Sequence, residues 1–288
     1  MDRFMKTKVI AILGVAANIV LLVVKLIVGF LGNSHAMIAD GFNSAGDVFA
    51  SFMTYAGNRI ASKPEDEDHP YGHGKAEYIF SLIISFSMML ICLQIFTSAA
   101  GSILHREALE FSWWLLGVAI FTIITKLSLY LYARKANQQM ENLLVTANAE
   151  DHRNDIFVTS ATLLGILFSQ LGVYWMDGLA GIGISVWIGY TGVRIFMSSY
   201  HVLMDTDMDE RLKAEITEAI STVEGVDHID HLTSRPVGIR RLVIVKVSVC
   251  CEMTLHESHG VAARIREKLH SMKNIQDTVV HINPVDPV

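Results

Sequence analysis

Long apolar runs separated by short polar segments fill the first two thirds of the chain. A helix needs roughly 20 mainly apolar residues to cross the roughly 30 Å hydrocarbon core of a membrane. Six runs reach that length, at Val9 to Leu31, His35 to Ala61, Tyr78 to Leu104, Phe111 to Ala133, Val145 to Leu171 and Met176 to Ser199. The pattern therefore predicts six membrane-spanning helices. The first run is too long for a removable signal peptide, so we expect it to stay in the protein.

From about Asp205 onward the chain is mixed in charge and its apolar periods are shorter. Helical spacing and strand-like alternation follow in the order helix, strand, strand, helix, strand, at residues 209–223, 226–232, 242–250, 255–272 and 277–282. We therefore expect an α-helical membrane domain at 1–204 and a small α+β domain at 205–288. A domain of that size buries little core alone, which suits a dimerisation unit.

Composition and charge narrow the class of protein. Hydrophobic residues make up 51% of the chain and charged residues 18%, which excludes an ordinary soluble enzyme. The net charge of −6 gives no basic surplus for holding phosphates, so we expect no nucleic-acid partner. Lysine and arginine collect at the amino terminus and in the second-to-third and fourth-to-fifth connections. This bias predicts a multi-pass protein of the cell membrane, surrounded by lipid, with both termini in the cytoplasm.

Two of the predicted spans contain pairs of polar side chains four residues apart. Asn43 and Asp47 form the pair in the second span, and Asp151 and Asp155 form the pair in the fifth. Residues at this spacing lie on one face of a helix, so two such helices can close four oxygen ligands around one cation. Oxygen ligands suit Mn²⁺, Mg²⁺ or Fe²⁺, whereas zinc sites usually include imidazole or thiolate. Manganese is the leading metal on this argument.

Ion pairing is the alternative interpretation of these aspartates. Buried cations that could pair with them occur in several spans, namely Lys25, Lys126, Arg153 and Arg194. Pairing alone does not explain two matching spacings, so we prefer a metal site. His152 follows a candidate ligand but points roughly 100° around the helix, so we expect it to pack or to meet water.

A second candidate site lies in the predicted cytoplasmic connection at 63–75, which two prolines keep from being helical. Asp66 or Asp68, together with His69 and His73, could bind a cation there. The alternative is a solvated acidic loop that raises the local cation concentration by its charge.

Histidines also occur in the tail, where each one alone is more often a surface or core residue than a ligand. His259 on the last predicted helix and His281 on the last predicted strand could approach each other in a domain of this kind. If they do, they could bind a regulatory metal.

Taken together, the chain resembles the cation diffusion facilitator family along nearly its whole length. The resemblance is carried by the six spans and their paired ligands, by His-x-x-x-His-Gly-Lys at His69 to Lys75, by Leu-Met-Asp at 203–205, and by Val-Val-His-Ile-Asn-Pro at 279–284. It implies a homodimeric exporter that exchanges a divalent metal for protons and has a ferredoxin-like cytoplasmic domain.

The resemblance also assigns roles to residues. It implies a transport site at Asn43, Asp47, Asp151 and Asp155, a loop site at Asp66, His69 and His73, and a charge pair at the dimer junction formed by Lys75 and Asp205. The Asn, Asp, Asp, Asp pattern is similar to that of the bacterial manganese subgroup. Asn283 replaces an aspartate of the zinc-type tail, and the strand near Val247 or Ser248 lacks a histidine, so we expect no full binuclear site there.

These observations predict a Mn²⁺/H⁺ antiporter that has metal as its substrate and no prosthetic group. Export of Zn²⁺, Fe²⁺ or Co²⁺ by the same fold is the alternative. An intramembrane metal hydrolase is disfavoured because the chain has no His-Glu-x-x-His. A sensor whose tail signals without transport is a further class, and neither a hydrolase nor a sensor would move metal across a membrane.

Overall fold

The computed structural model describes the backbone of residues 3–31, 35–105, 113–138, 140–170, 175–272 and 275–285. Within these ranges the description excludes the side chains at 35–40, 42–43, 102–105, 165–170 and 175–177. The chain divides into two compact units. One unit contains Met1–Pro64 and Ala76–Tyr200, and the other contains Glu65–Lys75 and His201–Val288.

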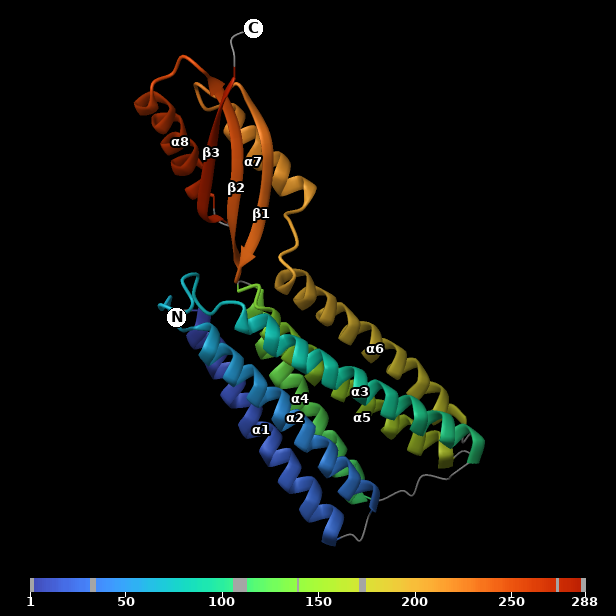
Figure 1. Ribbon diagram of the computed structural model, residues 1–288. Helices are drawn as coiled ribbons and strands as arrows, with labels where there is room; N and C mark the ends of the chain where they lie inside the picture. Colours follow the sequence, from blue (N-terminus) through green and yellow to red (C-terminus); the bar gives the residue numbers. More distant parts are fainter. Residues whose placement is uncertain are drawn as a thin grey trace. The chain divides into compact units, whose positions relative to one another are not determined.

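The first unit is a bundle of six long helices (Figure 1). These are α1 (Arg3–Leu31), α2 (His35–Ala61), α3 (Ala76–His105), α4 (Trp113–Asn137), α5 (Leu143–Gln170) and α6 (Trp175–Leu203). Each of the six predicted spans coincides with one helix, and the ends differ by only a few residues apart from the start of α1. That helix begins at Arg3 because the basic residues before Val9 continue it. The prediction of a six-helix membrane fold is confirmed.

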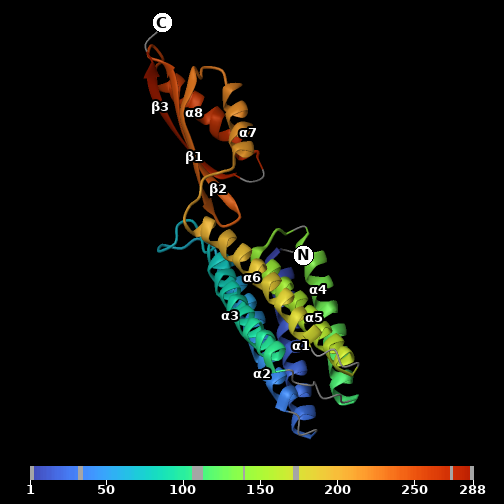
Figure 2. The same ribbon diagram turned by 90° about the vertical axis from the view of Figure 1, so that its right-hand side faces the viewer.

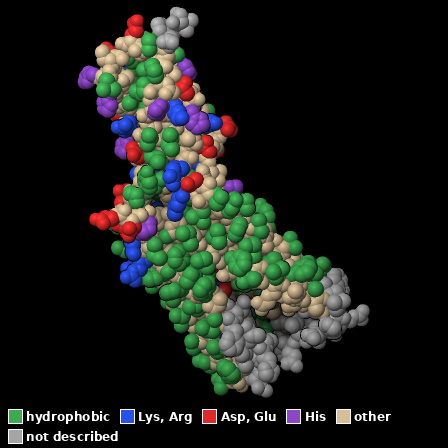
Figure 3. Space-filling model, in the orientation of Figure 1, with side chains coloured by type: hydrophobic (Ala, Val, Ile, Leu, Met, Phe, Trp, Pro, Cys, Tyr) green, Lys and Arg blue, Asp and Glu red, His purple; other side chains and the backbone are tan. Residues whose placement is uncertain are grey.

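Large apolar side chains cover the outside of the bundle, as a lipid-facing surface requires (Figure 3). Among the described residues, α1, α3, α4 and α6 contain stretches long and apolar enough to cross a membrane. The helices α2 and α5 are of similar length, at 27 and 28 residues, but they carry the polar pairs. The two polar helices are therefore the ones whose side chains need partners inside the bundle.

Close packing holds the interior of the bundle together. Ile84 of α3, Leu144 of α5 and Ile188 of α6 belong to one buried cluster. A Cβ atom on Gly57 of α2 would lie 2.7 Å from the Cβ of Phe80, so α2 and α3 approach each other more closely than any larger residue would allow. Substituting this glycine would force the two helices apart.

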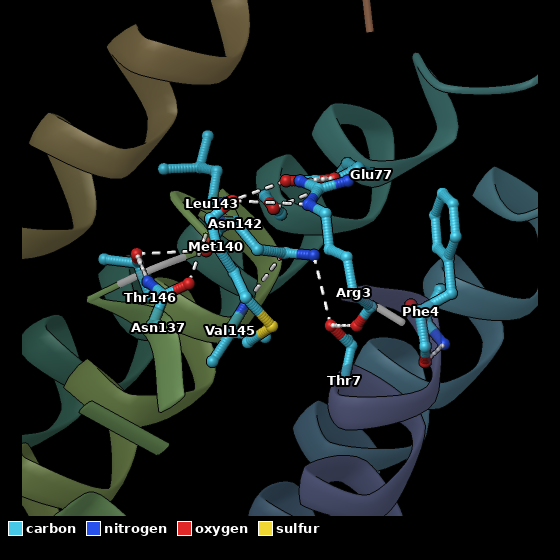
Figure 4. Close-up of polar contacts among 12 residues, drawn as sticks. Arg3, Phe4, Thr7, Glu77, Asn137, Met140, Asn142, Leu143, Val145 and Thr146 are labelled. Atoms are coloured by element: carbon cyan, nitrogen blue, oxygen red, sulfur yellow. Dashed lines mark hydrogen bonds and ion pairs between the residues drawn. The ribbon is translucent and has the colours of Figure 1, made fainter. Parts of the chain in front are cut away.

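A buried polar network joins α1, α3 and the start of α5 at one end of the bundle (Figure 4). The Arg3 guanidinium donates to Glu77 Oε2 at 2.7 Å, and Glu77 Oε1 accepts the backbone N–H of Leu143 at 2.8 Å. Asn142 caps α5 by accepting the Val145 N–H at 3.1 Å, and its amide donates to Thr7 at 3.3 Å. Glu77 is 2% exposed, so this ion pair is shielded from water.

The second unit is a small α+β fold. Its elements are α7 (Glu210–Ser221), β1 (His228–Val237), β2 (Arg240–Cys250), α8 (Leu255–His270) and β3 (Ile275–Val285). The sheet has the order β1-β2-β3, with β1 antiparallel and β3 parallel to the central β2. The predicted order of helix, strand, strand, helix, strand is confirmed. Both helices cover the same side of the sheet (Figure 2).

Alternation along β2 builds the core of this unit. The valines at 243, 245, 247 and 249 are at most 3% exposed and face Ile216 and Ile220 of α7 and Ile265 and Leu269 of α8. The helix starts are fixed by capping side chains. Asp209 accepts the Leu212 N–H at 2.8 Å, and Thr254 with Glu257 forms a reciprocal capping box at α8.

Candidate transport site

Three carboxylates from α2 and α5 lie inside the bundle. Asp47 is 3% exposed and Asp151 is 5% exposed, and the side chain of Asp155 is 19% exposed. The three are close enough for their charges to act on one another. Asn43 lies in α2 one turn before Asp47, but its side chain is outside the described residues. The structure therefore brings together three of the four predicted ligands and leaves the fourth undescribed.

Lys126 of α4 joins the two helices that carry these carboxylates. Its ammonium donates to Asp47 Oδ2 at 2.8 Å and also contacts Asp155 Oδ2. The lysine is 0% exposed, which makes it the largest fully buried side chain among the described residues. One cation thus touches one member of each predicted pair. Ion pairing, the alternative interpretation of these aspartates, is therefore present beside the predicted metal ligands.

The other cations weighed as partners behave differently. Lys25 donates to Ser44 Oγ at 3.0 Å. Arg153 pairs with Glu150 on its own helix, and its guanidinium lies 5.3 Å from the centre of the Trp187 ring. Lys126 is the cation whose ion pairs reach both α2 and α5, and the charge of Lys25 also acts on Asp155.

His152 lies closer to the carboxylates than its helical position indicated. One ring nitrogen of His152 and one oxygen each of Asp151 and Asp155 all lie within 4.8 Å of one another. The histidine is 1% exposed. Among the described residues, neither its Nδ1 nor Asp151 Oδ2 has a hydrogen-bond partner. Buried polar atoms in this position have the capacity to accept a ligand.

Polar side chains of α1 support this region. Asn18 donates to the backbone oxygen of Asp47 at 3.1 Å and to Ser51 Oγ at 3.0 Å, and the amide of Asn148 also donates to Ser51 at 3.3 Å. A Cβ on Gly14 would lie 2.9 Å from the same hydroxyl. These contacts fix α1 against α2 beside Asp47 and so position its carboxylate.

The loop of the second unit brings together the other predicted cluster. Asp66 accepts the backbone N–H of His69 at 2.7 Å and lies 3.0 Å from its Nδ1, while His73 Nε2 is 3.5 Å from the other oxygen. Asp66, rather than Asp68, joins the two histidines. Partial desolvation acts to raise the pKa of Asp66, but the hydrogen bonds from His69 outweigh it and lower this pKa. The cluster is open to water, since the Asp66 side chain is 52% exposed.

Lys75 and Asp205 form the predicted charge pair within one chain. Their atoms Nζ and Oδ1 are 2.6 Å apart, and Arg235 approaches the other carboxylate oxygen at 3.3 Å. The hydrogen bond from Lys75 lowers the pKa of Asp205. Asp205 also has a φ of 53°, so the chain turns sharply where α6 ends.

Two histidines of the tail, His259 and His281, were predicted as candidate metal ligands. His259 and His281 are exposed, and neither belongs to a group of three potential ligands among the described residues. His228 instead bridges Asp227 at 2.6 Å and Asp230 at 2.9 Å.

Asp230 is the centre of that arrangement. It accepts from Ser248 Oγ at 2.9 Å and from Asn283 Nδ2 at 2.9 Å. Hydrogen bonding to Asp227 raises the pKa of His228, and hydrogen bonding from Asn283 lowers the pKa of Asp230. The tail cluster is therefore held by hydrogen bonds and charge within the protein itself.

Comparison with known proteins identifies the class of molecule. Residues 11–204 match the cation efflux transmembrane domain, and residues 208–285 match the cytoplasmic domain of cation efflux proteins. The chain belongs to the cation efflux family. This is the cation diffusion facilitator family that the sequence resembles, so that expectation is confirmed. The cation efflux family consists of membrane transporters rather than enzymes.

Among the relatives of the cation efflux family, two carry manganese in their names. The manganese efflux system protein MneS of Bacillus subtilis is 33% identical over 99% of this chain and 98% of its own length. The manganese efflux system protein MneP of the same organism is 28% identical over 98% of both chains. The magnetosome protein MamM of Magnetospirillum gryphiswaldense is 31% identical over 88% of this chain and 80% of its own length.

Several residues of this cation efflux protein were missed by sequence reasoning. Lys126 was considered only as an alternative, and Asn18, Glu77 and Asp230 were not considered. Asn18 had a visible signal, because an amide inside an apolar helix needs a partner. Glu77 and Asp230 had no such signal. Each lies near the start of a helix or strand, where charged residues are common.

Proposed function

We propose that this protein exports Mn²⁺ from the cytoplasm in exchange for protons, by alternating access of one site to the two sides of the membrane. The observation that carries the proposal is the meeting of three carboxylates from α2 and α5, of which Asp47 and Asp151 are buried and Asp155 is partly buried. A buried carboxylate is costly unless something compensates its charge, and such residues inside a membrane domain mark ion pathways.

Asn43, Asp47, Asp151 and Asp155 are the proposed transport ligands. Their oxygen atoms favour a hard or borderline dication, and the names of MneS and MneP support manganese over the alternatives zinc, iron and cobalt. His152 is near enough to two of the carboxylates to add a nitrogen ligand.

Carboxylates that bind metal must be ionised, so protons compete with Mn²⁺ for the site. Facing the cytoplasm, the ionised site would capture the metal. Facing a more acidic exterior, protonation of Asp47, Asp151 or Asp155 would release it. Antiport of this kind needs only one site with alternating access.

Homodimer formation, cytoplasmic termini and a location in the cell membrane belong to the same proposal. The second family model is named for a dimer, and the basic residues of the connections favour a cytoplasmic position for the loop and the tail. The clusters at Asp66, His69 and His73 and at His259 and His281 are then candidate metal sites on the cytoplasmic side, and Lys75 with Asp205 is the candidate lock at the dimer junction.

Metal uptake into proteoliposomes tests the proposal. The purified full chain would be reconstituted and supplied in turn with Mn²⁺, Zn²⁺, Fe²⁺ and Co²⁺ under an imposed pH gradient. We expect Mn²⁺ to move fastest and its uptake to depend on the gradient. Asp151→Ala and Asp155→Ala should each reduce uptake to background.

A matched control is Glu218→Ala, which removes an exposed carboxylate from α7 and should leave uptake unchanged. Uptake that survives both aspartate substitutions would reject the proposed site. A wild-type protein that moves none of the four metals would reject the proposed function itself.

A further inference from the structure

We propose that Lys126 is a tethered counter-ion that occupies the carboxylate site between transport events and that the metal must displace it. This inference rests on the proposed function and assigns a role to a helix, α4, that contributes none of the predicted ligands. The role is one of positioning and competition, because the lysine acts on the carboxylates that would hold the metal.

The position of Lys126 is the first part of the argument. Its ammonium touches Asp47 Oδ2 from α2 and Asp155 Oδ2 from α5. An ammonium carries three donors and no acceptor, so it can serve two carboxylates at once. Lys126 is 0% exposed, so bulk water does not solvate its ammonium. The carboxylates of Asp47 and Asp155 are its ion-pair partners in the described structure.

The charge balance of the site is the second part. Asp47, Asp151 and Asp155 would repel one another in a poorly solvated interior if nothing compensated them. One ammonium compensates part of the negative charge and so reduces this repulsion. A dication at the same position would compensate more of the charge. Lys126 is therefore a covalently attached substitute for the substrate.

Competition for the same oxygen atoms is the third part. A dication binds carboxylate oxygens at roughly 2.0 to 2.6 Å, closer than the hydrogen-bond distance of an ammonium. The metal would bind the same carboxylates that Lys126 contacts, and the two cations repel each other at such short range. The flexible four-carbon stem of Lys126 lets its charge withdraw while the backbone of α4 stays in place.

Displacement has a consequence for the transport cycle. A carrier must return without metal after each release, and Lys126 compensates the carboxylates during that return. The same lysine weakens metal binding, because the metal has to expel it. Removing its charge should therefore tighten binding and slow the return, whereas exchange of metal for metal, which never passes through the return, should persist.

Lys126→Met tests this prediction, because methionine keeps an unbranched chain of similar length without charge. Mn²⁺ binding to the purified full chain would be measured by titration calorimetry, and net Mn²⁺ uptake and Mn²⁺/Mn²⁺ exchange would be measured in proteoliposomes. We expect the Kd to fall by about tenfold, as for the loss of one close charge interaction. Net uptake should fall at least as far while exchange stays near the wild-type rate.

Two variants serve as controls. Lys126→Arg keeps the charge and should keep the wild-type Kd within about threefold, as expected when a charge pair persists. Lys135→Met makes the same substitution at an exposed position of the same helix and should change neither binding nor flux. A purely structural role for Lys126 predicts instead that Lys126→Met weakens binding and lowers both fluxes together, and that result would overturn the proposal.

A wild-type measurement covers the case in which Lys126→Met does not fold. A structure of the wild-type protein loaded with Mn²⁺ should show the ammonium beyond hydrogen-bond distance of Asp47 and Asp155. An ammonium still bonded to both beside a bound metal would refute the displacement. If the wild-type protein transports metal and Lys126→Met binds Mn²⁺ no more tightly than wild type, this inference fails and the proposed function stands. If the wild-type protein transports no metal, the proposed function itself is rejected.

Discussion

Two clusters in this protein combine carboxylates with nitrogen groups, and they differ in their exposure to water. In the bundle, Lys126 is fully buried between Asp47 and Asp155. In the loop, Asp66 with His69 and His73 has a carboxylate that is 52% exposed. Exposed pairs contribute little because water and salt screen them, whereas breaking a buried pair leaves a charge that nothing solvates. We therefore expect the buried contacts of Lys126 to be needed for stability and transport, and the exposed contacts of Asp66 to matter much less for both.

The largest effect should come from breaking the buried cluster. Asp47→Ala leaves Lys126 with one carboxylate fewer, so we expect a loss of about 3 kcal/mol in stability and no Mn²⁺ transport. The double variant Asp47→Ala/Lys126→Met also removes the counter-ion of Asp155, so it should be less stable than Asp47→Ala and should not regain transport. Thermal unfolding in detergent and proteoliposome flux measure the two quantities. A double variant that is more stable than Asp47→Ala would mean that Lys126 does not compensate Asp155.

A selectivity change should be the next largest effect. Asp151→His replaces an oxygen ligand by imidazole, which favours zinc over manganese. We expect the ratio of Zn²⁺ to Mn²⁺ uptake to rise by about tenfold, which corresponds to about 1.4 kcal/mol from the exchange of one ligand. Glu150→Gln, which changes the preceding carboxylate, is the matched control and should leave the ratio unchanged. Equal ratios in Asp151→His and wild type would count against the softness argument.

The exposed cluster should tolerate substitution. His69→Ala removes one member of the loop group, and we expect stability to change by less than about 1 kcal/mol because the side chain of His69 is 56% exposed. Mn²⁺ uptake at saturating metal should stay within about twofold of wild type, with any loss confined to low metal concentrations where the loop could concentrate cations. His270→Ala, at an exposed position of α8, gives the baseline. Background-level transport in His69→Ala would place the loop in the transport path and contradict the difference between the two clusters.

The smallest effect concerns His228, an exposed histidine of the tail. Bonding to Asp227 and Asp230 raises the pKa of His228, so protonated His228 stabilises the folded tail. This contribution is fully present below the unfolded pKa, near 6.5, and disappears as the pH rises through the raised folded value. Histidine NMR signals of the full chain should give a midpoint above 6.5 for His228. Asp230→Asn should lower that midpoint; no change would mean that the pair does not persist in solution.

Hydrophobic periodicity predicted most of the fold, because it depends on interactions that every segment makes by itself. The bounds of α2, His35–Ala61, and the alternating valines of β2 were both correct for this reason. The spacing of Asp151 and Asp155 likewise placed both on one side of a helix. Such patterns show which face of an element is buried, and they require no knowledge of the neighbours.

The partners of these residues could not be predicted in the same way. Four cations of the predicted spans were candidates for pairing with the aspartates, and the choice of Lys126 depends on how α4 packs against helices distant in sequence. His152 is a second example. Its Cβ points away from the aspartates, but a ring nitrogen lies near the carboxylates of Asp151 and Asp155. In the tail, Asp230 gathers Ser248 and Asn283 because three strands bring them to one place.

The grouping of Glu65–Lys75 with the tail has a mechanical consequence. The polypeptide passes between the two compact units three times, after Pro64, after Lys75 and after Tyr200. The two units are thus connected covalently through three peptide segments rather than one. One of these attachments is the end of α2, the helix that carries Asp47, and so a pull on the tail has a continuous covalent route into the membrane.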